Sequence, residues 1–347
     1  MHSITKPFFA VVLLHGLGAP QNELAVIANK LRATFGNAVL IIQPSCRVRQ
    51  RSVYLTTQKQ AEKVLAYIQD KFIQYQTSKT LPVVLIGYSH GGVVAMLLGE
   101  RYSDNLNING IIAINAPLKG VALLKRNPKE IKEFMSEAKA SFQCIGYQSS
   151  WLYKTVVVNG MVSLLLPYLQ PSFRFTFPFC GLKDLHPESS CIETVGNFLH
   201  NGAYGIPILI IASYQDDFRK LFDIRQPIEQ YTETMIQLNQ IYSRYITGNH
   251  FQKHDTLLSL SSQLCRNYVT EYAIHDSSDG PNNTAMAPYT INCTNIKSKI
   301  YQDLIHAHNL IAINPFLFVA YGERVIHAHQ VLTDLISFIK ECTCLPV

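Results

Sequence analysis

The chain has 347 residues, of which 48% are hydrophobic and only 16% charged, so it can bury enough apolar surface to fold and is not expected to be disordered. Its formal net charge is +6, and its one dense basic cluster, residues 47–51 (RVRQR), contains no aromatic residue. We therefore interpret this cluster as solvent-exposed surface and expect no nucleic-acid binding.

The amino terminus begins with an apolar run that resembles a secretory signal. HGLG follows directly where a small-residue cleavage site would stand, which favours a buried first strand instead. The most apolar internal segment, residues 155–169, is too short to span a bilayer and contains Asn159, Gly160 and Pro167. We predict no transmembrane helix, and a protein that is cytoplasmic or exported without a cleavable signal peptide.

Strand-like apolar runs alternate with helix-like segments through the first third of the chain. Strands are predicted at residues 8–14, 38–45, 82–89 and 108–117, and helices at residues 22–36, 56–74 and 91–102. Continuous apolar strands between amphipathic helices are typical of a parallel sheet covered on both faces. The predicted fold class is therefore α/β, with a mostly parallel central sheet flanked by helices.

The alternation breaks at about residue 125. Residues 125–200 contain the only tryptophan, Trp151, and a stretch rich in proline and aromatic residues, which indicates an insertion into a single domain spanning 1–347. Beyond it we predict strands at 206–214 and 242–248. The chain closes with an apolar helix over residues 329–341.

Residues 83–92 (VVLIGYSHGG) join a predicted strand to a predicted helix through the pattern Gly-x-Ser-x-Gly. In a nucleophile elbow this turn lifts the serine, here Ser89, clear of the sheet, and Gly87 and Gly91 lack the β-carbons that would clash. The helix that follows directs unpaired N–H groups at the oxygen that becomes charged during attack. An ordinary Gly/Ser turn is the alternative, but the flanking strand and helix, with HG at residues 15–16 after an upstream strand, favour the elbow.

Several motifs resemble those of bacterial triacylglycerol lipases, within the α/β-hydrolase superfamily. The resemblance is good over the first 120 residues and patchy beyond them. It implies an α/β-hydrolase fold with the insertion as a cap or lid, and backbone N–H donors for an oxyanion at Leu17 and His90. The similar segments are LLHGLG (13–18, the oxyanion loop), GYSHGG (87–92, the elbow), NAPLKG (115–120, the turn after the next strand) and GLKDLHPESS (181–190, the return from the lid).

A catalytic serine in this fold needs an acid and then a histidine after it in the chain. Asp217 follows the predicted strand 206–214, where simple hydrolases carry the acid. Asp255 lies in HDTLLSLSSQ, which is similar to the acid loop of lipases except that threonine replaces a glycine. We favour Asp255 as the acid, with solvation or helix capping as its alternative role.

Four histidines compete for the role of base. In similar enzymes the base lies in a loop after the last strand, followed by apolar residues and a proline, and HNLIAINP fits this description best. We predict His308 as the base, with His306 as the alternative. The later pair, His327 and His329, is placed on the closing helix, where a histidine is more often packed than catalytic.

A metal site is a competing interpretation of HFQKHD, because His250 and His254 would align on a helix beside Asp255. The stretch follows a predicted strand and TGN, which favours a loop, and it does not match HExxH. The eight cysteines contain no CxxC pair or zinc-ligand spacing and are interpreted as mostly free thiols. We predict no metal and no cofactor.

These residues predict a serine hydrolase that cleaves carboxylic esters through an acyl-enzyme on Ser89. The expected substrates are esters of lipids, including phospholipids, or of other fatty-acyl compounds. The apolar insertion is expected to hold the acyl chain and to make peripheral contact with a membrane. An acyltransferase or a small-molecule esterase with the same triad is an alternative, as is a catalytically silent hydrolase fold that serves as a binding module. The sequence does not predict an oligomeric state.

Overall fold

A computed structural model describes most of the chain except the larger part of the predicted insertion, four later segments (216–231, 248–252, 266–293 and 306–322), the chain ends and a few isolated residues. The predicted residues Asp217, His306 and His308 lie outside the described residues. The described residues are 6–78, 80–127, 129–130, 133–134, 136–137, 179–215, 232–247, 253–255, 257–265, 294–305 and 323–344.

A parallel sheet forms the centre of the described molecule, in the order β2-β1-β3-β4-β5-β6. The strand order reverses between β1 and β3, and in such sheets ligands bind outside the carboxyl ends of the strands at this switch point. The strands are β1 (Phe9–Leu14), β2 (Val39–Ile42), β3 (Val83–Tyr88), β4 (Ile108–Ile114), β5 (Ile208–Tyr214) and β6 (Ile296–Gln302), with a separate parallel pair of β7 (Leu304–Ile305) and β8 (Glu323–Arg324).

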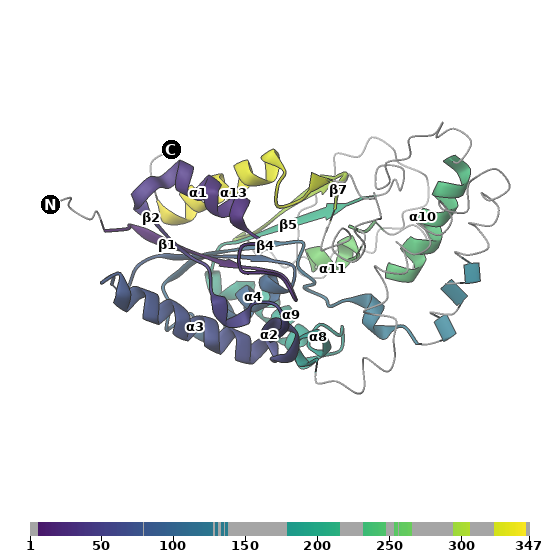
Figure 1. Ribbon diagram of the computed structural model, residues 1–347, viewed down its shortest axis with the longest axis horizontal. Coiled ribbons are helices and arrows are strands. Elements are labelled where there is room, and N and C mark those ends of the chain that lie inside the picture. Colours follow the sequence, from purple (N-terminus) through teal and green to yellow (C-terminus); the bar gives the residue numbers. More distant parts are fainter. Residues whose placement is uncertain are drawn as a thin grey trace.

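Helices cover both faces of this sheet (Figure 1). Side chains along each central strand alternate between two apolar clusters, so that Val11 packs toward one face and Val12 toward the other. Burial on both faces explains why the strands are continuous apolar runs. One face carries α1 (Ala25–Phe35) and α13 (His329–Thr343), and the other carries α3 (Thr57–Gln74), α4 (His90–Tyr102) and α9 (Ser190–His200).

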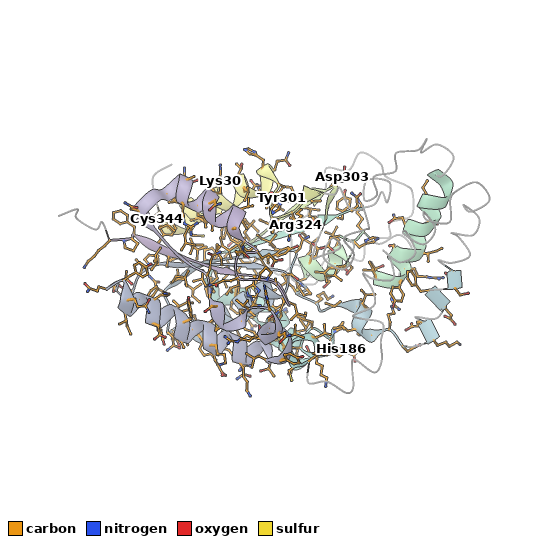
Figure 2. The ribbon with its side chains drawn as sticks, in the orientation of Figure 1. Lys30, His186, Tyr301, Asp303, Arg324 and Cys344 are labelled. Carbon is orange, nitrogen blue, oxygen red and sulfur yellow. The ribbon has the colours of Figure 1, made fainter. Side chains whose placement is uncertain are left out.

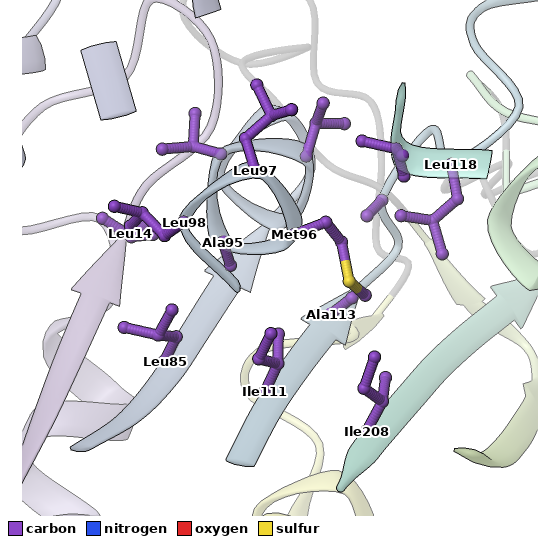
Figure 3. Packing of buried hydrophobic residues seen from close by; sticks show 14 of the residues in the cluster. Leu14, Leu85, Ala95, Met96, Leu97, Leu98, Ile111, Ala113, Leu118 and Ile208 are labelled. Atoms are coloured by element: carbon purple, nitrogen blue, oxygen red, sulfur yellow. The ribbon is translucent and has the colours of Figure 1, made fainter. Parts of the chain in front are cut away.

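Every residue of helix α4 from His90 to Gly99 is buried. Figure 3 shows its side chains, among them Met96, packed over residues of the neighbouring strands such as Leu85 and Ile111. A helix that is apolar all round is stable only inside a protein, and α4 lies between the sheet and the helices α3 and α9. The segment that follows Ser89 is therefore rigidly held by the core.

The remaining described helices are short or lie at the periphery. One of them contradicts a prediction, because residues 242–247 form the last turns of α10 and not a strand. Tyr245 and Ile246 are buried, and their aromatic and β-branched character resembles that of a strand although the segment continues a helix. These helices are α2 (Gln50–Tyr54), α8 (Cys180–Lys183), α10 (Thr232–Thr247), α11 (Leu260–Leu264), η1 (Gly36–Ala38), η2 (Ser45–Arg47), η3 (Ala122–Lys125) and η4 (Gly202–Gly205).

The predicted fold class is confirmed: the described sheet is parallel and carries helices on both faces. Of the predicted insertion at 125–200, residues 138–178 lie outside the described part of the chain. Its last segment forms α9, whose Phe198 packs against Gly99 of α4. Within the described residues, no helix combines the length and the apolar character that crossing a bilayer requires.

Candidate active site

Ser89 lies at the turn between β3 and α4, with φ 54° and ψ −126°. This left-handed backbone is strained for a residue with a β-carbon and occurs at functional turns. The two flanking glycines are required sterically. A β-carbon at Gly87 would lie 2.2 Å from the carbonyl oxygen of Gly91, and one at Gly91 would lie 2.0 Å from that of Leu14. The sequence therefore forms the sharp strand-to-helix turn that places a serine at the carboxyl edge of a sheet, and Ser89 is buried there, with 6% of its surface exposed.

The loop after β1 lies next to this turn and is held by two side chains. The backbone N–H of Gly16 donates to Glu23 Oε2 at 2.8 Å, and that of Gly18 donates to Ser52 Oγ at 2.7 Å. Leu17 lies between these two fixed residues. The orientation of its own peptide group is thus set from both sides.

Leu17 and His90 carry the two backbone N–H groups that are predicted to form an oxyanion hole. Among the described residues, neither the N–H of Leu17 nor that of His90 has a hydrogen-bond acceptor. The two segments are in contact, because a β-carbon at Gly91 would also lie 2.7 Å from the carbonyl oxygen of His15. Fixed N–H donors near a nucleophile, one of them at a helix amino end, can stabilise the negative oxygen of a tetrahedral intermediate.

The interpretation of the basic cluster at residues 47–51 as solvent-exposed surface is wrong for Arg47. Arg49 and Arg51 are exposed, but Arg47 is completely buried. The turn η2 follows β2 at the carboxyl edge of the sheet and directs the guanidinium inward, where oxygen and nitrogen acceptors replace water. Nη1 donates to the carbonyl oxygen of His15 at 2.5 Å, Nη2 donates to Nδ1 of His90 at 3.1 Å, and Nε donates to Gln60 Oε1 at 3.2 Å.

These contacts define the states of Arg47 and His90. Burial lowers the pKa of Arg47 to about 10, so the guanidinium stays charged at neutral pH. Since Nδ1 of His90 accepts from Arg47, Nε2 carries the proton and donates to Thr57 Oγ1 at 3.1 Å. Burial, reinforced by the charge of Arg47 and by His15, holds the pKa of His90 well below its ordinary value. The imidazole is therefore a neutral structural link between the turn and α3.

Asp255 is fully buried and its two oxygens have different partners. Oδ1 accepts from the backbone N–H groups of Leu257, at 3.0 Å, and Leu258, at 2.7 Å. Oδ2 accepts from Nδ2 of Asn115 at 2.9 Å. Asn115 directly follows β4, the strand beside the one that ends at Ser89. The carboxylate therefore lies at the carboxyl edge of the sheet, where an acid of a catalytic triad is needed.

The loop that carries Asp255 is docked on two neighbouring segments. The side chain of Gln263 in α11 accepts from the N–H of Ser213 at 2.9 Å and donates to its carbonyl oxygen at 3.0 Å, which ties the loop to β5. Ser262 Oγ donates to the carbonyl oxygen of Gly120 at 2.5 Å, in the loop after β4. Asp255 is thus positioned by β5 and by the loop after β4, and not by its own loop alone.

Of the predicted histidines, only the later pair lies within the described residues, and both members are exposed. His329 begins α13, whereas His327 belongs to the turn before it, so the prediction that both lie on the closing helix is only half right. Arg324 in β8, labelled in Figure 2, forms an ion pair with Glu23 Oε1 at 3.5 Å. The strand that follows the predicted base His308 is thus linked to the oxyanion loop.

The alternative metal site has no support among the described residues, where no group of three metal-ligating side chains occurs. His250 lies outside them. Burial lowers the pKa of His254 to about 4 although the neighbouring Asp255 raises it, so the imidazole is neutral. Each oxygen of Asp255 accepts hydrogen bonds from N–H donors.

Sequence reasoning missed two residues of this site, Arg47 and Asn115. Each is a polar residue just beyond a buried apolar strand, at the edge of the sheet where the site lies. That position is a usable signal in a parallel sheet, because the carboxyl ends of the strands converge on one edge. The partners of these two residues come from other strands and loops, so the spacing of residues near them in the sequence does not predict which partners they have.

The sequence profile of the palmitoyl protein thioesterase family matches residues 10–163, which is somewhat less than half of the chain and spans β1 to β4. No curated protein matches the chain. Among solved structures, the chain is similar to a gene product of Listeria innocua (9% identity, TM-score 0.46, 96% of this chain and 94% of that one). It is also similar to a highly thermostable carboxyl esterase of Bacillus coagulans (14% identity, TM-score 0.39, 98% of this chain and 92% of that one). A third similar structure is an esterase of Pyrococcus furiosus (13% identity, TM-score 0.39, 96% of this chain and 82% of that one).

Proposed function

We propose that this chain, which has the α/β-hydrolase fold, is a serine hydrolase that cleaves fatty-acyl esters or thioesters through an acyl-enzyme on Ser89. The observation that carries the proposal is the strained turn at Ser89, beside backbone N–H groups of Leu17 and His90 that have no acceptor among the described residues. The match with the thioesterase family covers this part of the chain and supports a hydrolase of the ester or thioester type.

The proposed reaction begins when Ser89 Oγ attacks the acyl carbonyl carbon and transfers its proton to a histidine base. The base is proposed to be His308, with His306 as the alternative, oriented by the carboxylate of Asp255. The negative oxygen of the tetrahedral intermediate accepts from the two N–H groups named above. The base then protonates the departing alcohol or thiol, and water activated by the same base releases the acid and restores Ser89.

The proposed preference for fatty-acyl groups depends on the insertion at residues 125–200. We propose that the apolar stretch of this insertion, residues 151–179, is a cap over the catalytic edge of the sheet that offers an apolar trough to the acyl chain and contacts a membrane peripherally. Each buried methylene contributes about 0.8 kcal/mol, so six additional carbons contribute about 5 kcal/mol to binding. A site for small polar esters has no use for such an apolar segment.

The first test compares the chain with Ser89→Ala, using Ser103→Ala, at the end of α4, as a matched control. Wild type and the control should hydrolyse both a p-nitrophenyl ester and an acyl thioester, and Ser89→Ala should hydrolyse neither. Circular dichroism and urea unfolding would verify that the variants are folded. Undiminished turnover by Ser89→Ala would exclude the serine mechanism.

The second test addresses the acyl group. kcat/KM is measured for p-nitrophenyl esters with two to sixteen carbons, with and without detergent micelles. We expect kcat/KM to rise from acetate toward medium and long chains, because each methylene adds to binding. A steady decline from acetate onward that micelles do not change would contradict the fatty-acyl proposal and favour a small-molecule esterase.

A further inference from the structure

Asn115 occupies a position directly beside the nucleophile. It follows β4, and the last paired residues of the two strands are Tyr88 and Ile114, so that Ser89 and Asn115 stand at the same level on neighbouring strands. The N–H of Ser89 donates to the carbonyl oxygen of Ile114 at 2.9 Å, and the N–H of Asn115 donates to that of Ile211 at 2.8 Å. These bonds fix Asn115 between the nucleophile and β5.

The side-chain amide of Asn115 reaches away from Ser89 to the proposed acid. Nδ2 donates one hydrogen to Asp255 Oδ2 at 2.9 Å and the other to Ser213 Oγ at 2.6 Å. The orientation of the amide is dictated by chemistry, because an ionised carboxylate only accepts hydrogen bonds and must therefore face the nitrogen. Asn115, Ser213 and Asp255 are all completely buried, so water does not compete for these bonds.

The two carboxylate oxygens of Asp255 are held in different ways. Oδ1 accepts from the N–H groups of Leu257 and Leu258 in its own loop. The bond from Asn115 to Oδ2 comes from the sheet and ties the carboxylate to the strand beside Ser89. A charge-assisted bond of this kind is stronger than one between neutral groups.

We propose that Asn115 is a positioning residue for the catalytic acid: its amide holds the carboxylate of Asp255 in the single orientation in which it can align the histidine base. The inference depends on the proposed function, since it assigns a role within the same triad. Asn115 is buried and both hydrogens of its side-chain amide are donated to Ser213 and Asp255, so it acts through Asp255 and not on the substrate.

Substitutions that test this role must preserve the backbone conformation of Asn115, so that a loss of activity does not come from a change in structure alone. Asn115 has a φ of 42°, in the left-handed region, which asparagine, aspartate and glycine tolerate better than other residues. Asn115→Asp therefore preserves the size and the backbone preference of the residue while it replaces the donor with an acceptor. Asn115→Gly preserves the backbone and removes the side chain.

The experiment measures kcat and KM for an acyl ester from pH 6 to pH 8 in wild type, Asn115→Asp, Asn115→Gly and Ser89→Ala. We expect Asn115→Asp to lower kcat at pH 8 by about 100-fold with little change in KM, because misalignment of the base affects the transition state and not substrate binding. Two facing carboxyl groups share a proton, and the protonated group is again a donor. The activity of Asn115→Asp relative to wild type should therefore rise by about tenfold between pH 8 and pH 6.

Asn115→Gly serves as the second variant. Its kcat should be lower than that of wild type by about tenfold or more, and the ratio should not change with pH because no titratable group is introduced. Wild-type kcat in either variant overturns the inference, and so does a pH-independent ratio for Asn115→Asp. Failure of the proposed function is recognised separately: Ser89→Ala would then retain the activity of wild type, or wild type would have none, and the inference would fail with it.

Discussion

Arg47 is a full positive charge that the fold buries without a carboxylate among its hydrogen-bond partners in the described residues. Burying a charge is costly unless hydrogen bonds replace the lost water. Two of its three partners, the carbonyl of His15 and the imidazole of His90, belong to the segments that present the proposed oxyanion donors. Arg47 thus links the two segments that carry these donors.

We expect Arg47→Lys to lower kcat by about 10- to 100-fold with little change in KM, because a lysine keeps the charge but cannot bond His15 and His90 at once. The matched control is Arg51→Lys, which makes the same change at an exposed position four residues later. Steady-state kinetics of ester hydrolysis provide the measurement. Equal kcat values in the two variants would contradict this role of Arg47.

The acid is tested by Asp255→Asn, measured beside Asp217→Asn. We expect Asp255→Asn to reduce kcat by about 10³- to 10⁴-fold, because the amide no longer orients the base or stabilises its charged form. Asp217→Asn should have a much milder effect, and His308→Ala should match the loss in Asp255→Asn. If Asp217→Asn is the inactive variant, the acid follows β5 and the buried carboxylate of Asp255 has a structural role.

Among the elements, the contact between α4 and the end of β1 is the closest in the site. A β-carbon at Gly91 would lie 2.0 Å from a backbone oxygen of Leu14, which no side-chain movement can relieve. At Gly99, further along the same helix, the nearest atoms are the ends of the side chains of Ile111, at 2.7 Å, and Phe198, at 3.0 Å. The same substitution therefore meets a rigid obstacle at one position and an adjustable one at the other.

Gly91→Ala should destabilise the protein by about 3 kcal/mol or more, at the upper end of the range for overpacking. Gly99→Ala should change stability by less than about 1 kcal/mol, because the gain in helix propensity offsets part of the crowding. Urea unfolding of the two variants gives both values. Equal stabilities would mean that α4 can move away from β1, and the rigid oxyanion geometry would not hold.

The elements differ in how far the sequence predicts them. β1, β3 and β5 are continuous apolar runs because both of their faces are buried, and such runs are easily identified. β6 escapes prediction because it is the edge of the described sheet, where Lys297 and Lys299 alternate with less exposed residues and pair with acidic residues of α13.

In the site, too, local motifs can be predicted from the sequence, whereas contacts between distant residues cannot. Ser89 and its glycines form a local motif whose spacing follows from the sterics of one turn. Asn115 and Arg47 have no such motif, because Asn115 meets Asp255 across 140 residues and Arg47 meets His90 across 43. Contacts of this kind depend on strand order, which the sequence indicates only in general terms.

Two buried neutral histidines make the free energy of unfolding of the whole protein depend on pH. His90 and His254 have pKa values below the ordinary value of 6.5, to about 4 for His254, mainly because burial disfavours the charged form. Below pH 6.5 the unfolded chain binds protons that the folded protein does not. Their contribution to stability is therefore complete above pH 6.5 and is lost as the pH falls toward the lower pKa values of the folded state.

We expect each histidine to reduce the free energy of unfolding by up to about 1.4 kcal/mol per pH unit as the pH falls below 6.5. His90→Gln isolates one of them, since the amide offers an acceptor to Arg47 and a donor to Thr57 but does not titrate. Urea unfolding at pH 7 and pH 5 should show a smaller loss in this variant than in wild type. Identical losses of unfolding free energy would show that His90 has the same pKa in the folded and the unfolded state.

If Ser89 is the nucleophile, a reagent that reacts with activated serines should form a covalent bond with it. Wild-type protein is treated with a fluorophosphonate probe, digested, and analysed by peptide mass spectrometry, with Ser89→Ala treated in parallel. We expect one adduct, located on Ser89 in wild type and absent from Ser89→Ala. An adduct on another residue, or no adduct in a wild-type preparation that hydrolyses acyl esters, would contradict this role of Ser89.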